Sequence, residues 1–364
     1  MIGMLSALLL SGILAHPQRL CRDVRSCEQL CAPPSTLARV DAGSVILEDQ
    51  LDHAAAFARN RTIECLWHLG RLGERARSAQ VRVAAYLEVQ GWPLRVVAAW
   101  ALGRMHADGQ VVALRARLHD NEWQVVAQAV HSLVLLQDSS SISSLRKLSE
   151  EHWYPAIRTL ASRGIRAIRS GRPHALDAYF MSTPNRPVRD QYISPDENPF
   201  AHWFPWQAAT GTEPPDWFCE PTSENQRSIG RNSVSWSGGR LMGANRGEFV
   251  GALYWLKHGK KHRLASGNVV HIQSIDARRA WVLTGYAHLG MQSGALLEVD
   301  MTPYGKPHIR KLFNLPGDPI VLRTSSDGIT VHTSTVNVRV EPAMERNGFI
   351  IRRVACSNPR KSTQ

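Results

Sequence analysis

Apolar residues recur along residues 62–170 with the spacing of an amphipathic helix, and the whole pattern repeats after roughly 32 residues. The segment CLWHLGRL at 65–72 returns as AAWALGRM at 98–105, and weaker copies of the helix that begins at 94 begin at 125 and 157. Within each copy Leu and Ala fall three or four residues apart, so one face of each helix is apolar. Self-similarity at this period predicts stacked helical repeats.

A second apolar series runs between these helices at spacings of 31 residues, and its members are Val83, Leu114 and Leu145. Turn-forming residues separate the two series, so each unit is predicted to be a pair of helices joined by short turns. Only a neighbouring unit can cover such an apolar stripe, which predicts an α-solenoid over residues 62–180. An ordinary helical bundle is the alternative. In the solenoid, successive rungs of one core would be Leu69, Leu102, Leu133 and Ile165.

The most regular copy, LRVVAAWALG at 94–103, resembles the short HEAT-like repeats first associated with phycobilisome lyases. The resemblance covers about 62–170, with a flanking helix near 45–59. It implies helix pairs that act as a protein-binding scaffold, and it carries neither a catalytic residue nor the lyase activity. Tryptophans recur at the predicted helix starts, where packing between layers is favoured over a stacking platform for ligand rings; they are Trp92, Trp123 and Trp153.

Beyond residue 232 the apolar period falls to two, which predicts an antiparallel all-β domain over 233–364. The β-rich segments lie at 253–258, 269–275, 280–284, 295–299, 308–314, 320–324, 329–333, 336–340 and 349–354. The stretch 281–299 resembles the strand–turn–strand rhythm of β-propeller blades, without a WD or kelch signature. Because a blade takes roughly 40 residues, an incomplete propeller and a β-sandwich both remain open. The fold class is thus multidomain α and β.

Three further segments complete the predicted organisation. Residues 1–15 are an uncharged apolar run typical of a secretory signal peptide, which predicts a periplasmic or secreted protein. No Lys or Arg precedes the run, so an anchoring or buried helix is the alternative. Residues 16–61 form a cysteine-containing segment with a capping helix. Residues 181–232 form an acidic, proline-rich connector whose aromatic residues indicate contact with a domain surface.

The six cysteines are an even number, and export makes disulfides the default expectation. We favour a pair between Cys219 and Cys356, which flank the basic C-terminal region. The remaining disulfide candidates are Cys21, Cys27, Cys31 and Cys65. A zinc site built from those four is one alternative, although their spacing lacks the usual Cys-x-x-Cys element. Scattered reduced cysteines are the other.

The formal net charge of +12 is uneven: residues 181–226 carry −5, whereas residues 227–364 carry +12. A basic domain of this kind attracts polyanions such as anionic lipid headgroups, acidic wall polymers or nucleic acid. The densest cluster falls on a predicted hairpin tip and contains Lys257, Lys260, Lys261 and Arg263. The alternative interpretation is a solvated loop that discourages edge pairing of strands.

Tyr286 and His288 fall in a Gly-rich turn and are further candidate binding residues, because loops often carry function. Glu248 would join them only if the fold brought the two loops together. Hydrogen bonding of His288 to local backbone groups is the structural alternative.

The sequence lacks phosphate-binding, dinucleotide-binding, zinc-protease and serine-hydrolase motifs, and its histidines show no metal-ligand spacing. We therefore expect no cofactor, no metal and no catalytic residue. The expected function is binding or scaffolding in the cell envelope, with a protein partner in the solenoid groove and an anionic component on the β domain. The alternatives are an envelope-polymer hydrolase with a loop-built site on the β domain, and an intracellular nucleic-acid-binding repeat protein, against which export would argue.

Overall fold

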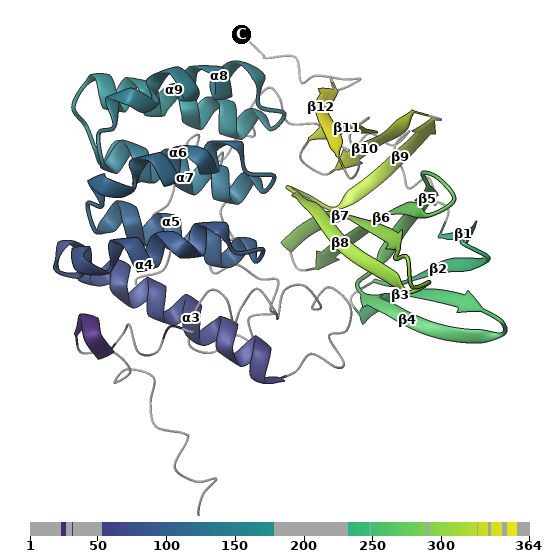
Figure 1. The fold of residues 1–364 in the computed structure, drawn as a ribbon. Helices are drawn as coiled ribbons and strands as arrows, with labels where there is room; N and C mark the ends of the chain where they lie inside the picture. The colour runs from purple at the N-terminus through teal and green to yellow at the C-terminus, as the bar shows by residue number, and fades with distance from the viewer. Residues whose placement is uncertain are drawn as a thin grey trace, which may run out of the picture.

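The computed structural model places helices in the N-terminal half of the described chain and antiparallel strands in the C-terminal half (Figure 1). It describes residues 23–26, 31, 53–177, 232–247, 249–288, 291–325, 327–333, 336–343 and 348–354. The predicted signal peptide at 1–15, nearly all of the connector and the predicted Cys219–Cys356 pair lie outside these residues.

Four long helices pack side by side in chain order, α3 on α5, α5 on α7 and α7 on α9 (Figure 1). Their bounds are His53–Leu72 for α3, Trp92–Arg104 for α5, Trp123–Leu135 for α7 and Pro155–Arg169 for α9. Proline stands in the first turn of α5 and α9, where its missing N–H leaves no helical bond unmade. Each long helix contributes one of the four predicted rungs to a single hydrophobic core.

Shorter helices connect the long ones, as the second apolar series predicts. They are α4 (Gln80–Ala84), α6 (Val111–Ala116) and α8 (Ile142–Glu151), and they bury Val83, Leu114 and Leu145. Short 3₁₀ segments flank them: η2 (Gly73–Ala79), η3 (Ala85–Glu88), η4 (Asp108–Gln110), η5 (Arg117–His119) and η6 (Ser139–Ser141). The connecting part of each unit is therefore less regular than a single predicted helix.

Three of the long helices end in the same way. After α5, His106 adopts a positive φ of 51°, its N–H bonds Gly103 O and the next N–H bonds Leu102 O. Gln137 after α7 and Gly171 after α9 repeat this pair of backbone bonds at positive φ. Such an ending is a Schellman motif, which satisfies the last carbonyl groups of a helix. The positive-φ residues of the three motifs are 106, 137 and 171, so the motif recurs at a spacing close to the 32-residue sequence period.

The long helices approach one another closely where the repeat places glycine. A Cβ added at Gly103 of α5 would lie 2.7 Å from the Ser132 hydroxyl of α7. That hydroxyl donates to Ala99 O across the helix interface at 2.8 Å. A larger residue at position 103 would therefore force the two helices apart.

The described residues of the β region form three four-stranded antiparallel sheets, each made of four consecutive strands. The first contains β1 (Ser233–Trp236), β2 (Gly239–Arg246), β3 (Phe249–Lys257) and β4 (Lys260–Ser266). The second contains β5 (Val269–Ser274), β6 (Arg279–His288), β7 (Met291–Met301) and β8 (Pro307–Leu315). The third contains β9 (Pro319–Ser325), β10 (Gly328–Thr333), β11 (Asn337–Pro342) and β12 (Phe349–Val354).

The two halves of the molecule meet along β8 and share one hydrophobic core (Figure 1). Phe313 of β8 lies 6.1 Å from the Trp153 ring at the start of α9 and stacks on Phe349 of β12. Leu312 and Leu315 belong to the same core as the helix residues. We call this contact between β8 and the first turns of α5, α7 and α9 the seam.

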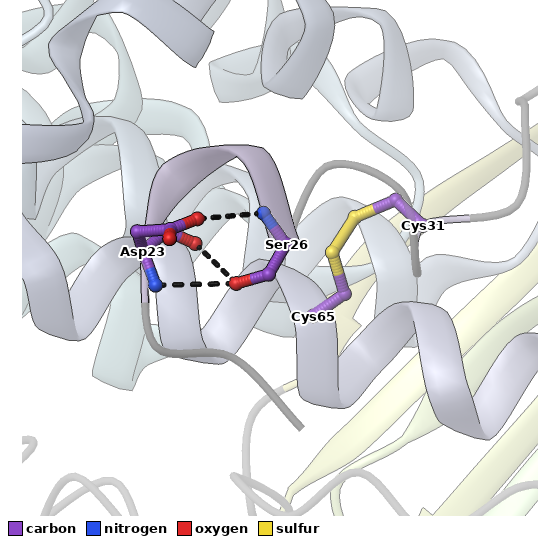
Figure 2. Close-up of a disulfide and its surroundings, with 4 residues drawn as sticks. All are labelled: Asp23, Ser26, Cys31 and Cys65. Atoms are coloured by element: carbon purple, nitrogen blue, oxygen red, sulfur yellow. Dashed lines mark hydrogen bonds between the residues drawn. A yellow bond between two sulfur atoms is a disulfide. The ribbon is translucent and has the colours of Figure 1, made fainter. Parts of the chain in front are cut away.

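A disulfide joins Cys31 to Cys65 of α3, with 5.6 Å between the two Cα atoms (Figure 2). It uses two of the four cysteines of the alternative zinc site, so these four do not bind zinc together. Nearby, Ser26 N donates to the Asp23 carboxylate at 2.8 Å and Asp23 N donates to the Ser26 hydroxyl at 3.1 Å. The bond from Ser26 N to the charged carboxylate is the largest cause that lowers the pKa of Asp23. Disulfides are typical of oxidising compartments, with which the predicted export is compatible.

Candidate functional site

The basic cluster lies on the β3–β4 hairpin, as predicted. Lys257 pairs with Lys260 across a two-residue turn in which His258 has φ 50° and Gly259 has φ 72°. Two positive φ angles are those of a type I′ turn, which matches the twist of the flanking strands. The register also sets Leu256 opposite Lys261. The tip therefore carries three lysines, Lys257 and Lys260 beside the turn and Lys261 one residue further along β4.

Two aromatic side chains of β3 position two of these lysines. The Lys261 ammonium lies 3.8 Å from the centroid of the Tyr254 ring, and the Lys257 ammonium lies 4.9 Å from that of Trp255. Both distances are within the range of cation–π attraction. Trp255 is itself buried against Trp236 of β1 and Leu264 of β4 in the core of the β region. The Lys257 side chain is thus positioned by a ring anchored in that core, whereas the Tyr254 ring next to Lys261 is half-buried.

The charge of the hairpin is not balanced nearby. None of its three lysines forms an ion pair with another described residue, and Lys260 and Lys261 are exposed. The sequence from 232 to 266 contains one acidic residue, Glu248, which lies outside the described residues. Arg263 differs from the lysines because its guanidinium donates to the Ser266 hydroxyl at 2.8 Å. The lysines at the tip are therefore the groups most accessible to an anion.

Tyr286 and His288 lie at the other end of the first two sheets. Both belong to β6, and the neighbouring Gly285 N donates to Asn268 O at 3.0 Å. The Asn268 side chain accepts from Gly251 N near the start of β3 at 2.8 Å. Gly251 is six residues from Lys257, which is roughly 20 Å along a strand. The structure therefore does not bring Tyr286 and His288 together with the lysines, and the His288 side chain is not among those described.

An ionic network at the seam is the main feature that the sequence analysis missed. Glu122, the N-cap residue of α7, is buried, and its carboxylate accepts from Asn314 N of β8 at 2.9 Å. The Lys311 ammonium lies 3.7 Å from the same carboxylate and 5.3 Å from the centroid of the Trp92 ring. Burial raises the pKa of Glu122, while Lys311 and the Asn314 N–H act in the opposite direction.

A second ion pair, between Arg95 and Asp120, contacts the backbone of Glu122. The Arg95 guanidinium binds the Asp120 carboxylate through two bonds of 2.8 Å, and the same carboxylate accepts from Glu122 N at 3.0 Å. Arg95 also donates to the carbonyls of Val89 and Gln90. These groups are satisfied by one another, so the network suits positioning of α5, α7 and β8 rather than exchange with a substrate.

A third polar cluster ties the segment after α9 to α7. The ring of His131 is buried, its Nε2 lies 2.9 Å from the Asp177 carboxylate and its Nδ1 lies 3.2 Å from the Gln128 amide. His174 contacts the other Asp177 oxygen at 3.0 Å. Burial lowers the pKa of His131 more than Asp177 raises it, so the neutral imidazole is favoured. The arrangement anchors a chain segment.

In the part of the chain that the structure describes, no three His, Cys, Asp or Glu side chains gather as a metal site would require. No helix within the same part is both long enough and apolar enough to cross a bilayer. No protein-family model matches the chain, and the comparison with curated proteins finds no match either.

Proposed function

We propose that this protein is a non-catalytic binding or scaffolding protein of the cell envelope, which contacts an anionic component through the β3–β4 hairpin. The observation that carries the proposal is the set of three lysines at the hairpin tip, which have no described acidic partner. Two of them, Lys257 and Lys261, lie over the rings of Trp255 and Tyr254. An exposed cationic tip on a rigid hairpin attracts anions and loses this attraction as salt increases.

The proposal includes a HEAT-like α-solenoid for the helical half. The chain order of the packed helices, the single core of the four rungs and the recurring Schellman endings support it. Val81 and Val112 are 68% and 70% exposed at positions 31 residues apart on α4 and α6. Large exposed apolar side chains at equivalent positions favour this side of the helices for the protein partner. The first turns of the long helices are less suited to this partner, because the seam covers them.

For the β half we propose a propeller-like arrangement of three blades. Each sheet contains four consecutive antiparallel strands, which is the topology of a blade, whereas a sandwich exchanges strands between its sheets. The helical half packs against the second and third sheets through the shared core. Three blades are too few for a closed ring, so part of the sheet surface would be exposed. The helical half would cover that surface.

The test of the hairpin is sedimentation with phosphatidylglycerol vesicles. Replacing Lys257, Lys260 and Lys261 together with glutamine should weaken binding by roughly 100-fold, since each lysine near an anionic surface contributes about 1 kcal/mol. The matched control replaces the exposed Arg75, Arg146 and Lys306 and should bind within about twofold of the wild-type protein. Equal losses in both variants, or no loss in the hairpin variant, would contradict the proposal.

A further inference from the structure

The first long helix, α3, has a side that no other long helix of the described chain covers. Ser132 of α7 faces the preceding helix α5, because a Cβ added at Gly103 would lie 2.7 Å from its hydroxyl. Ala101 of α5 faces α3 in the same way, since a Cβ added at Gly70 would lie 3.0 Å from its Cα. The sequence repeat places His68 of α3 at the equivalent position. His68 therefore marks the end side of the helical stack, where a preceding helix would lie.

Cys65 lies near this end side and is nevertheless covered. It precedes His68 by three residues, which is about 60° around a helix. Its side chain is 1% exposed, and a disulfide joins it to Cys31 (Figure 2). Val24, which precedes Cys31 in the chain, is partly buried against the same core. We call the described residues 23–26 and 31 the cap, because they cover α3 where the repeat lacks a preceding helix.

The cap has little structure of its own. Residues 23–26 form a single helical turn, and a helix of that length does not persist alone. Asp23 and Ser26 bond to each other, which holds the turn in shape but does not attach it to α3. Asp23 and Arg25 are exposed, and Val24 is only partly buried. The disulfide restrains the cap independently of such weak contacts.

We propose that the Cys31–Cys65 disulfide is a redox-sensitive closure, whose reduction releases the cap and uncovers the end side of α3. Cys31 is half-buried and Cys65 is buried, so a thiolate of a dithiol reductant reaches the Cys31 sulfur first. The disulfide bond breaks, and Cys65 leaves as a thiolate that takes up a proton. The second thiol of the reductant then displaces Cys31, which is also protonated. The reductant becomes a disulfide, and its two electrons and two protons are now on the two cysteines.

Opening changes the surface at the end of the stack. Leu72 follows Cys65 by seven residues and therefore lies on the same side of α3, where it is half-buried against the core. The ends of stacked repeats must be covered, because an apolar end associates with other chains. Oxidising conditions keep this apolar side closed, and a reductant opens it. The closure does not depend on the β3–β4 hairpin or on its partner.

Hydrogen exchange of the full chain, measured by mass spectrometry with and without dithiothreitol, tests the closure. Reduction should raise the exchange rate at least tenfold in peptides that contain 23–26 and in peptides from 61–72. Local opening needs only the cap and the end of the stack to loosen. Peptides from α7 should keep their rate within twofold, because α7 lies between α5 and α9.

A double variant separates this disulfide from the other cysteines of the chain. Cys31→Ser with Cys65→Ala removes both thiols, and alanine is the residue at the equivalent buried positions of the later units, Ala98, Ala129 and Ala161. Packing of α3 on α5 should therefore persist, with unchanged helix content by circular dichroism. Without reductant, the variant should exchange in 61–72 as fast as the reduced wild-type protein. Dithiothreitol should change that rate less than twofold.

Four results would overturn the proposal. The first is unchanged exchange in 61–72 when the wild-type protein is reduced. The second is an equal increase in α7, which would mean that the disulfide stabilises the whole helical half and not a local cap. The third is a double variant that exchanges as slowly as the oxidised wild-type protein. The fourth is a response of that variant to dithiothreitol as large as the wild-type response, which would assign the effect to other cysteines.

Discussion

His152 lies in the turn between α8 and α9 and depends on being neutral. Its Nδ1 accepts from Tyr154 N at 3.0 Å, and its ring stacks on Trp153. Burial lowers the pKa of His152 to about 4, and Arg158 acts in the same direction. Protonation would place a hydrogen on the atom that accepts the Tyr154 N–H. The turn that begins α9 is therefore sensitive to acid.

We predict that His152 makes the protein less stable as pH falls from about 6.5 to about 4. In this range the unfolded chain binds a proton at His152 and the folded chain does not, so folding loses up to about 3 kcal/mol. Above pH 6.5 the contribution is complete. Replacement with asparagine, whose side chain can accept the same i+2 N–H without titrating, should flatten this part of the pH profile.

Urea unfolding of both proteins between pH 4 and pH 7 checks this. The wild-type midpoint should fall more steeply with acid than that of His152→Asn. Parallel pH profiles would show that another group is responsible, with His131 as the next candidate because burial also lowers its pKa.

At the residue scale, the sequence predicted which side chains are buried better than it predicted which residues they contact. Trp92 and Trp123 are 5% and 6% exposed, in agreement with the packing interpretation of the repeated tryptophans. What they pack against was not predictable, because the period gives their place at helix starts and not the strand beyond them. Asp120 is a similar case: its place just before α7 follows from the sequence, but the bonds of its carboxylate to Arg95 and to Glu122 N do not.

Among the elements, β8 has the greatest influence on how the halves fit together. It is an edge strand of its sheet, so its outer backbone groups lack a neighbouring strand. Glu122 accepts one of these N–H groups, and Phe313 enters the shared core. Covering an edge in this way satisfies buried backbone groups and blocks pairing with another chain.

We predict that Glu122→Ala destabilises the protein by roughly 3 kcal/mol, because the Asn314 N–H and the Lys311 ammonium lose a buried partner. Glu122→Gln keeps an acceptor for the N–H and should cost less than half as much. Urea unfolding at neutral pH measures both, and faster hydrogen exchange at Asn314 should accompany the alanine variant. A loss under about 0.5 kcal/mol for alanine would contradict the role of the seam.

The strands show what periodicity detects. All nine predicted β segments overlap observed strands, because each is rich in the apolar residues that strands bury. Strands β1, β2 and β4 were not predicted, because β1 is short, β2 contains glycine and β4 begins with the run Lys260, Lys261, His262 and Arg263. That run was expected to be a hairpin tip, and it is also half of the edge strand β4. Polar edge strands carry little alternation to detect.

On the scale of the whole molecule, one core joins two halves that the sequence presents as independent domains. The order of helices and strands follows from local periodicity. The seam does not, because it joins residues such as Glu122 and Asn314, which are 192 positions apart. The same holds for the separation of charge, since the Glu122 carboxylate at the seam is buried whereas Lys260 and Lys261 of the hairpin are exposed.

The central claim is that these outward cations bind an anionic partner, and the salt dependence of binding by the wild-type full chain tests it most directly. Binding to phosphatidylglycerol vesicles, followed from about 50 to 500 mM salt, should weaken steeply and linearly on a log–log scale because counterions are released. Neutral phosphatidylcholine vesicles should not bind at any salt concentration. Binding that is absent at low salt, or that does not change with salt, would contradict the account.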